Sequence, residues 1–588
     1  MGRGRRVYAF FVIRYRQGGS MQDEGIRRHW PGGNSGTIAI NQEGPAQDPK
    51  KVQALNQMGV VALQNGDYPE AIRLMRDSVA LDDRNPGSFN NLGQALYAVG
   101  DAVGAEENYR RALELDPANP DFLNNLGIAL GGLDRLQEAK AVYEEALIFR
   151  STDHEIFHNY GGLLQEMGIL DQAQEALEEA LRLNPYMEAT VLSLGGVYNE
   201  LGDKEAAIGA YKNAVELNPF YVDAHEALKL IFWDLGERDR LDESYYRACQ
   251  IFPQSSEAHS NLGRALGFSQ RFEEAERALN KSLELDPRNA EAHNQLGKIY
   301  AIQERFNKAV GEHKEAIRFA GGNALYYEEF GNTLILAGDY REAVNVLLKS
   351  HELNPRGSSI LGALTIAMKE AGDNRISYFL NNDEFVTTRY IEVPDGFDSL
   401  DDFNDALHKE LAARHDDKPH WGDFSWPPGQ SQHGGTQIPD NVFANPSGMT
   451  AILKQQISKA MAEYLGGLKQ DPDHPFLRYL NPDFRFTGAF SNIIHPSGYD
   501  GSHIHPEGWI SGVYWVKMPD LPEENWEAGE GCTQFGEPPE HLISERNKME
   551  LLVRSQAGMT AFFPSYYWHG VRPFGGSDTR HAIAFDII

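Results

Sequence analysis

A strict repeat of 34 residues is the feature that most limits how this chain can fold. Glycine recurs at this step, and alanine recurs at the same step twelve residues after each glycine. A small residue on each of two helices lets the helices approach closely, and the proline that closes many units cannot continue a helix. Each unit is therefore predicted to be a pair of packed helices. The markers are Gly59, Gly93, Gly127, Gly161, Gly195, Gly263, Gly297 and Gly331, with Ala71, Ala105, Ala139, Ala173, Ala207, Ala275, Ala309 and Ala343.

Nine such units fit residues 52–357 without an insertion. The sixth is degenerate, because Lys229 and Leu241 stand where glycine and alanine are expected. The period and the marker positions resemble the tetratricopeptide repeat. This resemblance implies an α-solenoid with a concave binding groove. Residues 358–385 are predicted to be a helix that caps the stack, followed by a linker.

Asparagine recurs two residues before the repeat glycine, at a position that is not in the core of an amphipathic helix. These residues are Asn91, Asn125, Asn159 and Asn261. Side-chain amides in such a column can bond the backbone of an extended peptide. The column resembles the asparagine ladder in the tetratricopeptide portion of O-GlcNAc transferases. The alternative is that these are simply soluble groove residues. The groove is expected to bind a protein or peptide partner.

The composition excludes some classes of binding partner and indicates the cellular compartment. A net charge of −31 argues against nucleic acid or an anionic membrane as the main partner. With only Cys249 and Cys532, the chain has neither a disulfide framework nor a thiolate metal cluster. A cytoplasmic location is therefore expected. Residues 1–51 are expected to be a disordered tail or a misassigned start, with Met21 as an alternative start. The short apolar run in this tail cannot span a membrane.

The 34-residue period stops before residue 386, where short strand-like runs begin. At 588 residues the chain is too long for one core. The prediction is a multidomain protein, with an all-α tetratricopeptide solenoid followed by a mainly β domain over residues 386–588. Two helices, at residues 400–413 and 449–465, are expected to flank the strands.

His503 and His505 lie two residues apart in this second region. In an extended segment both rings project from the same face, with Cα atoms about 7 Å apart, and can share one ion. His569, which follows an aromatic run, is the best third ligand. Neutral imidazoles suit Fe(II) and Zn(II). Arg580 lies eleven residues beyond His569, and its planar guanidinium suits the carboxylate of a metal-bound oxo acid.

Several ordered segments here resemble a bacterial and phage group of 2-oxoglutarate/Fe(II)-dependent oxygenases. They are residues 503–506 (HIHP), 511–515 (SGVYW) and 563–565 (FPS), followed by His569, Pro573 and Arg580. The resemblance covers about residues 437–588. It implies a double-stranded β-helix, or jelly roll, that holds Fe(II) and 2-oxoglutarate and uses O₂. The expected site residues are His503, His505 and His569 for the metal, with Arg580 and, as a further candidate, Tyr514 for 2-oxoglutarate.

One departure from the wider superfamily leaves the third metal ligand open. Most members carry an aspartate or glutamate two residues after the first histidine, where this chain has His505. All three histidines could bind the metal. Alternatively, His503 and His569 could bind it with water in the third place. A shifted pair of His505 and Glu507 is the least favoured, because Pro506 between them disfavours a regular strand.

The leading hypothesis is a hydroxylase that acts on a protein or peptide held by the repeat groove. Remote binding energy would come from the groove, and oxidising power from the iron. Two alternatives remain. One is a non-catalytic scaffold with a silent jelly-roll domain, and the other is an oxygenase that acts on a small molecule. The sequence sets neither the hydroxylated atom nor the oligomeric state.

Overall fold

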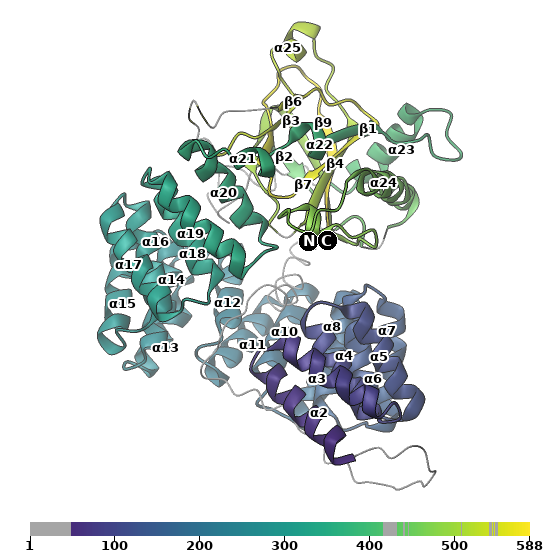
Figure 1. The fold of residues 1–588 in the computed structure, drawn as a ribbon, viewed down its shortest axis with the longest axis vertical. Helices are drawn as coiled ribbons and strands as arrows, with labels where there is room; N and C mark the ends of the chain where they lie inside the picture. The colour runs from purple at the N-terminus through teal and green to yellow at the C-terminus, as the bar shows by residue number, and fades with distance from the viewer. Residues whose placement is uncertain are drawn as a thin grey trace. The chain divides into compact units, whose positions relative to one another are not determined.

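The computed structural model describes residues 49–415, 432–438, 441–444, 446–506, 508–539, 542, 544, 546 and 551–588. It divides the chain into two compact units, Met1–Pro253 and Gln254–Ile588 (Figure 1). This division lies inside the repeats, whereas the sequence places a boundary at residue 357. Most of the predicted tail lies outside the described residues, and residues 49–51 belong to the first described helix.

The described part of the first unit is helical, and consecutive helices pack as pairs. Asparagine and aspartate begin several helices, as where Asn85 accepts a hydrogen bond from the Ser88 amide at 3.2 Å. The helices are α2 (Pro49–Gln64), α3 (Tyr68–Leu81), α4 (Pro86–Ala98), α5 (Ala102–Leu115), α6 (Pro120–Gly132), α7 (Leu136–Phe149), α8 (His154–Glu166), α9 (Leu170–Leu183), α10 (Glu188–Leu201), α11 (Lys204–Leu217), α12 (Val222–Asp234), η1 (Arg238–Arg240) and α13 (Glu243–Ile251).

The repeat glycines lie where two helices meet, as the spacing predicts. A Cβ atom added at Gly93 would lie 2.6 Å from the Tyr109 ring of the following helix. Ala105, the small residue of the second helix, is fully buried. The degenerate sixth unit is the irregular one. Lys229 is buried on α12, and the second helix is reduced to η1 and the short α13.

The second unit begins with the last three repeats and their final helix. These helices are α14 (Ser256–Phe268), α15 (Phe272–Leu285), α16 (Ala290–Ile302), α17 (Phe306–Phe319), α18 (Ala324–Leu336), α19 (Tyr340–Leu353) and α20 (Ser358–Ala371). Shorter and flanking helices follow, namely α21 (Ile376–Phe379), α22 (Asn382–Phe385), α23 (Leu400–Ala412), α24 (Gly448–Gly467), η2 (Leu477–Tyr479) and α25 (Glu523–Glu527). The two predicted flanking helices are thus confirmed as α23 and α24.

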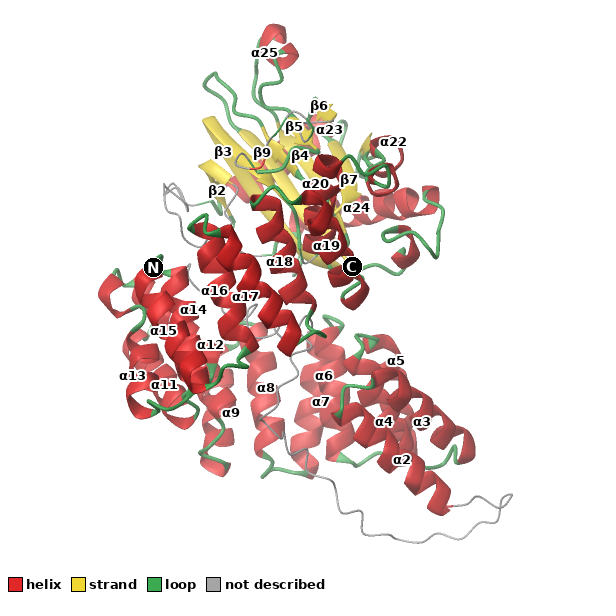
Figure 2. Cartoon of the chain, turned by 60° about the vertical axis from the view of Figure 1, so that its left-hand side comes forward, coloured by secondary structure: helices red, strands yellow, loops and turns green. Residues whose placement is uncertain are grey.

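A curled antiparallel sheet completes the unit, which agrees with the predicted jelly roll (Figure 2). The strand order is β1-β7-β4-β9-β3-β8-β5-β6, and β2 pairs with β3. The strands are β1 (Thr387–Tyr390), β2 (Gln432–Gln437), β3 (Phe486–His503), β4 (Ile510–Lys517), β5 (Thr533–Phe535), β6 (Leu551–Val553), β7 (Met559–Pro564), β8 (His569–Val571) and β9 (Arg580–Ile587).

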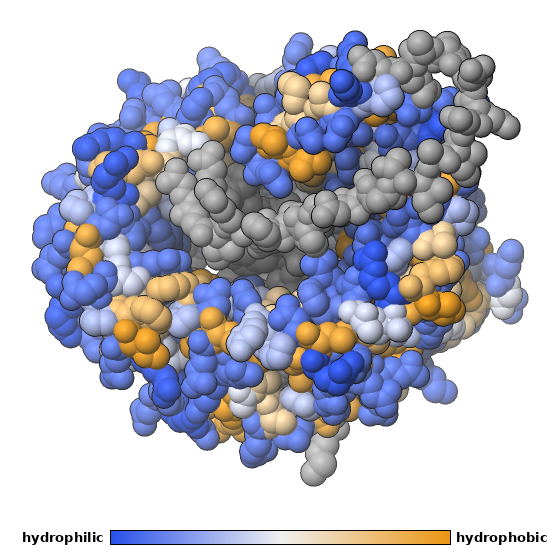
Figure 3. All heavy atoms as spheres, turned by 90° about the horizontal axis from the view of Figure 1, so that it is seen from below, coloured by the Kyte–Doolittle hydropathy of each residue, from blue (hydrophilic) through white to orange (hydrophobic). Residues whose placement is uncertain are grey.

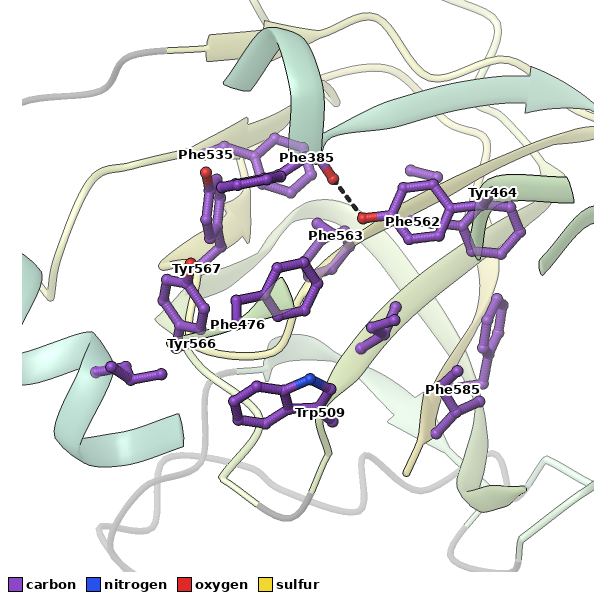
Figure 4. Packing of buried hydrophobic residues seen from close by; sticks show 14 of the residues in the cluster. Phe385, Tyr464, Phe476, Trp509, Phe535, Phe562, Phe563, Tyr566, Tyr567 and Phe585 are labelled. Carbon is purple, nitrogen blue, oxygen red and sulfur yellow. Dashed lines mark hydrogen bonds between the residues drawn. The ribbon is translucent and has the colours of Figure 1, made fainter. Parts of the chain in front are cut away.

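Alternation along β9 separates the two faces of this sheet. One face carries Arg580, Ala582 and Asp586. The opposite face carries Ile583 and Phe585, and the Phe585 ring packs against Phe443, Phe486 and Phe562. Figure 4 shows the aromatic packing around these strands, including the hydrogen bond from the Tyr464 hydroxyl to the Phe385 carbonyl.

One hydrophobic core runs from the last repeat into the sheet of the second unit. It joins Phe330 and Leu347 of that repeat to Leu361 of α20 and onward to Phe562 and Ile587 of the sheet. On the outer surface, large apolar side chains are scattered among hydrophilic ones (Figure 3). Among the described residues, no helix has the length and apolarity that a membrane crossing needs.

His313 occupies an apolar position in the eighth repeat. A Cβ at Gly297 would lie 2.7 Å from its ring, in the place that Leu279 takes in the preceding repeat. The ring is fully buried and lies within hydrogen-bond distance of Asn294 and Thr333. Burial, with a smaller effect of the Lys298 charge, lowers the pKa of His313 to about 3.

We expect His313 to make the second unit less stable as the pH falls below 6.5. The unfolded histidine then takes up a proton that the native one does not, so the free energy of unfolding falls by up to about 1.4 kcal/mol per pH unit until the native pKa is reached. His313→Leu should remove this share of the pH dependence. Urea unfolding of both proteins between neutral and acidic pH measures it, and equal pH slopes would contradict the account.

Candidate metal centre

The three predicted histidines come together at one end of the sheet. His503 is the last residue of β3 and pairs with His569, the first residue of β8, while His505 lies in the turn that follows β3. One potential ligand atom from each histidine lies within 4.8 Å of the other two. The Nε2 atoms of His503 and His505 are 3.2 Å apart. Two atoms at this separation can each lie about 2.1 Å from one ion.

Each of the three rings is held by its other nitrogen. Nδ1 lies 2.9 Å from the Gly501 carbonyl in His503 and 2.9 Å from the Tyr567 carbonyl in His569. In His505, Nδ1 lies 2.7 Å from Oδ1 of Asp586. These partners are acceptors, so each Nδ1 carries the proton and donates it. Each Nε2 is left with a lone pair, which is the arrangement of histidines that bind metals.

The electrostatics also favour a cation. Burial lowers the pKa of His503, partly opposed by the nearby Asp500 carboxylate. Burial and the two neighbouring imidazoles hold the pKa of His569 well below its usual range. Burial would also lower the pKa of His505, but the Asp586 carboxylate outweighs it and the pKa is raised. Three imidazoles close to two carboxylates form a set that an ion such as Fe(II) suits.

A bulge in β3 brings His503 opposite His569. The register of the β3–β8 pair shifts between Asp500 and His503. The backbone of this bulge passes close to Gly570, the residue after His569. A Cβ at Gly570 would lie 2.6 Å from the Asp500 carbonyl oxygen. Glycine is therefore needed beside His569 so that the bulge can approach it.

Arg580 begins β9 on the face that carries Asp586, and it is 3% exposed. Its Nη2 donates to Oγ1 of Thr533 at 3.2 Å, while Nε has no partner among the described residues. Burial lowers the pKa of Arg580 to about 10, so it still carries its charge at neutral pH. A buried guanidinium with an unused donor is costly unless an anion joins it. The residue therefore fits the carboxylate of an oxo acid.

Two further polar atoms on this face are buried and unpartnered within the described structure. They are Oδ1 of Asn492 and Nε1 of Trp515. Both residues pair with Ala582, one from each side of β9. Ala582 is small and lies two residues from Arg580. The Trp515 donor, the Asn492 acceptor and the Arg580 guanidinium therefore share one part of this face. Such atoms fit a polar ligand better than a closed apolar core.

Tyr514 is not brought to this cluster. It pairs with Ile583 and therefore lies on the opposite face of the sheet from Arg580. Its hydroxyl donates to Oδ1 of Asn404 on α23 at 2.6 Å. This placement does not fit the expected hydrogen bond to 2-oxoglutarate. Trp515, the next residue, lies on the same face of the sheet as Arg580. Glu507, the least favoured ligand, lies outside the described residues.

Two of the asparagines predicted for the groove make bonds that the sequence did not predict, and Asn125 is buried although its position was expected to lie outside the core. Nδ2 of Asn125 donates to Asn90 at 2.8 Å, and Nδ2 of Asn159 donates to Asn124 at 3.0 Å. These bonds link neighbouring repeats, and they use part of the hydrogen-bonding capacity that a peptide would need. Asn91 and Asn261 occupy half-buried positions on α4 and α14. The sequence signal for these bonds was the pair of adjacent asparagines in two successive repeats, at residues 90–91 and 124–125.

Asp586 is the main site residue that the sequence reasoning missed. It accepts from Ser511 at 2.6 Å as well as contacting His505. Its signal was its position six residues after Arg580 in the region predicted to be mainly β, because an even separation along a strand places two residues on one face.

Comparison with known families supports both parts of the chain. Residues 488–586 match the family described as "Putative 2OG-Fe(II) oxygenase". Tetratricopeptide repeat families match residues 104–134, 121–151, 163–222, 256–281 and 269–303. The chain therefore carries tetratricopeptide repeats followed by a domain of the 2-oxoglutarate/Fe(II) oxygenase type. No curated protein matches it.

Solved structures similar to this chain include tetratricopeptide proteins. A structure titled for PilF of Pseudomonas aeruginosa is 23% identical over 36% of this chain and 96% of its own, with a TM-score of 0.31. PilW, described as a type IV pilus biogenesis factor, is 21% identical over 35% of this chain and 96% of its own, with a TM-score of 0.32. A thermophilic tetratricopeptide protein of Thermus thermophilus is 20% identical over 31% of this chain and 99% of its own, with a TM-score of 0.29.

Proposed function

We propose that this protein is an Fe(II)- and 2-oxoglutarate-dependent oxygenase that hydroxylates a protein or peptide recruited by the repeat groove. The observation that carries the proposal is the anchoring of three Nδ1 atoms by acceptors, which leaves three imidazoles able to offer Nε2 to one ion. The family match over residues 488–586 supports the same class of chemistry.

Three histidines would hold the metal, namely His503, His505 and His569. Asp586 keeps the proton of His505 on Nδ1 and orients its ring, which makes Nε2 a better ligand. This arrangement favours the three-histidine set over the alternatives with water or Glu507. When bound, Fe(II) with 2-oxoglutarate supplies the oxidising power to insert an oxygen atom from O₂ into a C–H bond.

Arg580 would hold the far carboxylate of 2-oxoglutarate, because its Nε donor is buried and free to pair. Thr533 fixes the guanidinium from β5, and Trp515 offers an indole N–H on the same face. The surrounding apolar strands exclude bulk water, which strengthens these bonds. Side chains on β4, β5 and β9 would thus orient 2-oxoglutarate.

Recruitment is assigned to the repeats because a solenoid provides an extended surface but no catalytic group. Half-buried asparagines such as Asn91 and Asn261 are the candidate contacts to a peptide backbone. Asn125 and Asn159 would contribute mainly by fixing the wall of the groove, since each bonds a neighbouring repeat.

Asp586→Asn tests the anchoring of His505. An amide can still accept from Nδ1, but it lacks the charge that makes the imidazole a stronger ligand. We expect the Kd for Fe(II) to rise about tenfold, at the lower end of what loss of such a partner costs. Anaerobic Fe(II) titration measures this change. An unchanged Kd would show that His505 does not depend on Asp586.

The proposed reaction is tested with the full-length protein, Fe(II), 2-oxoglutarate and a peptide library. Succinate formation reports turnover, and ¹⁸O from labelled O₂ in a peptide reports hydroxylation. Label in a peptide is the expected result. Succinate without any labelled peptide would favour a small-molecule substrate, whereas no succinate from iron-loaded protein would favour the scaffold.

A further inference from the structure

The last helix of the repeat stack, α20, is buried on nearly every side. Every residue from 360 to 368 is buried, and this run covers more than two full turns of the helix. A helix that ends a repeat stack ordinarily presents a polar face to water. Here α18 and α19 pack on part of α20, and residues in the turns that connect the strands, namely Ile504, Tyr566 and Trp568, contact another part.

Three side-chain hydrogen bonds tie α20 to the segments that carry the histidines. Nε1 of Trp568, the residue before His569, donates to the Gly362 carbonyl at 3.0 Å. Oγ of Ser358 donates to the Gly508 carbonyl at 2.8 Å, in the turn that contains His505. Nζ of Lys369 donates to the Gly536 carbonyl at 3.1 Å.

Gly536 in turn connects this contact to His569. Its amide donates to the Trp568 carbonyl at 2.8 Å. The preceding residue, Phe535, pairs with His569 across β5 and β8 and stacks on its ring with centroids 6.1 Å apart. Trp568, the residue before His569, is thus linked to α20 both directly and through Gly536.

Gly362 of α20 packs closely against the segments on either side of the candidate ligands. A Cβ at this position would lie 3.0 Å from Cδ1 of Ile504 and 3.4 Å from the carbonyl oxygen of Tyr566. Ile504 lies between His503 and His505 in the sequence. A side chain at Gly362 would therefore push on the segment that carries two of the three candidate ligands.

We propose that α20 is a positioning element of the metal centre, and that Gly362 is its key residue. The inference rests on the proposed metal role of His503, His505 and His569. Metal sites need their ligands within about 0.5 Å of the productive geometry. The repeat stack would supply this precision through one helix, so the last repeats belong to the catalytic machinery as well as to recruitment.

Co(II) titration of the metal-free, full-length protein tests this inference without any turnover. Gly362→Ala should raise the Kd for Co(II) about tenfold, comparable with loss of a ligand's supporting contact, and should change the visible Co(II) absorption spectrum. Ile504→Val removes the Cδ1 atom that the new methyl group would meet. The double variant Gly362→Ala/Ile504→Val should therefore recover most of the affinity.

Gly311→Ala is the matched control, because Gly311 lies in α17 and an added Cβ meets no atom within 4 Å. It should leave the Co(II) spectrum unchanged. Trp568→Phe removes a donor to α20 without adding bulk, and it should also change the spectrum if Gly362→Ala proves too unstable to titrate. Co(II) binding by wild type with unaltered spectra in Gly362→Ala and Trp568→Phe would overturn the inference alone. No Co(II) binding by wild type would overturn the proposed function and the inference with it.

Discussion

Arg580→Ala is expected to abolish useful binding of 2-oxoglutarate while Fe(II) still binds. The buried guanidinium has an unused Nε donor, and within the described structure its Nη2 donates to Thr533. Loss of a charge-assisted, two-pronged pair with a carboxylate costs about 3 kcal/mol, which corresponds to a Kd about 100-fold higher. Calorimetric titration of 2-oxoglutarate into the anaerobic Fe(II) protein measures this change.

Two variants make the result specific. Arg580→Lys keeps the charge but loses the planar fork, so its affinity should fall between those of wild type and Arg580→Ala. Arg554→Ala removes an exposed arginine that pairs with Glu523 at the surface, and it should bind 2-oxoglutarate like wild type. Equal affinity in wild type and Arg580→Ala would contradict the assignment of this residue.

Truncation of the repeats should have two different outcomes, depending on where the chain is cut. A protein that begins at Gln254 keeps the whole second unit and should fold. A protein that begins at Ser358 loses Phe330, Leu334 and Leu347, which are buried in the core shared with the sheet. Each such side chain contributes about 1.5–3 kcal/mol, so their joint loss is comparable with the whole stability of a domain.

Near-ultraviolet circular dichroism and urea unfolding distinguish these outcomes. The longer fragment should unfold cooperatively and keep uncoupled succinate formation, but the KM for a peptide substrate should rise strongly if the removed repeats recruit it. The shorter fragment should lack a cooperative transition. Cooperative folding of the shorter fragment would show that the sheet does not depend on the last repeats, and an unchanged peptide KM in the longer one would remove the recruiting role of the first unit.

The repeats could be predicted because their physical cause is visible in the sequence. A helix pair that packs at Gly93 or Gly127 needs a small residue at a fixed place, so the period appears directly as recurring letters. The division at Pro253 could not be predicted in this way. It depends on which helices pack together in three dimensions, and the repeat period is the same on both sides of the division.

The clustering of the three histidines was predictable from spacing, whereas the residues that share a face with Arg580 depended on the strand register. His503 and His505 share a strand end and the family pattern fixes His569. The face of the sheet on which Tyr514 lies depends on how β4 pairs with β9. A register shift of one residue would move every side chain of β4 to the other face. The structure pairs Tyr514 with Ile583, so Trp515 faces Arg580 instead.

The measurement that tests the central claim most directly is anaerobic addition of Fe(II) and then 2-oxoglutarate to the full-length protein, followed by visible absorption. A chelated oxo acid on Fe(II) gives a weak metal-to-ligand charge-transfer band. We expect this band in wild type, and we expect it to be lost in His569→Ala and much weakened in Arg580→Ala. Absence of the band from wild type that has been shown to hold Fe(II) would contradict the proposal that this site is a 2-oxoglutarate-dependent oxygenase centre.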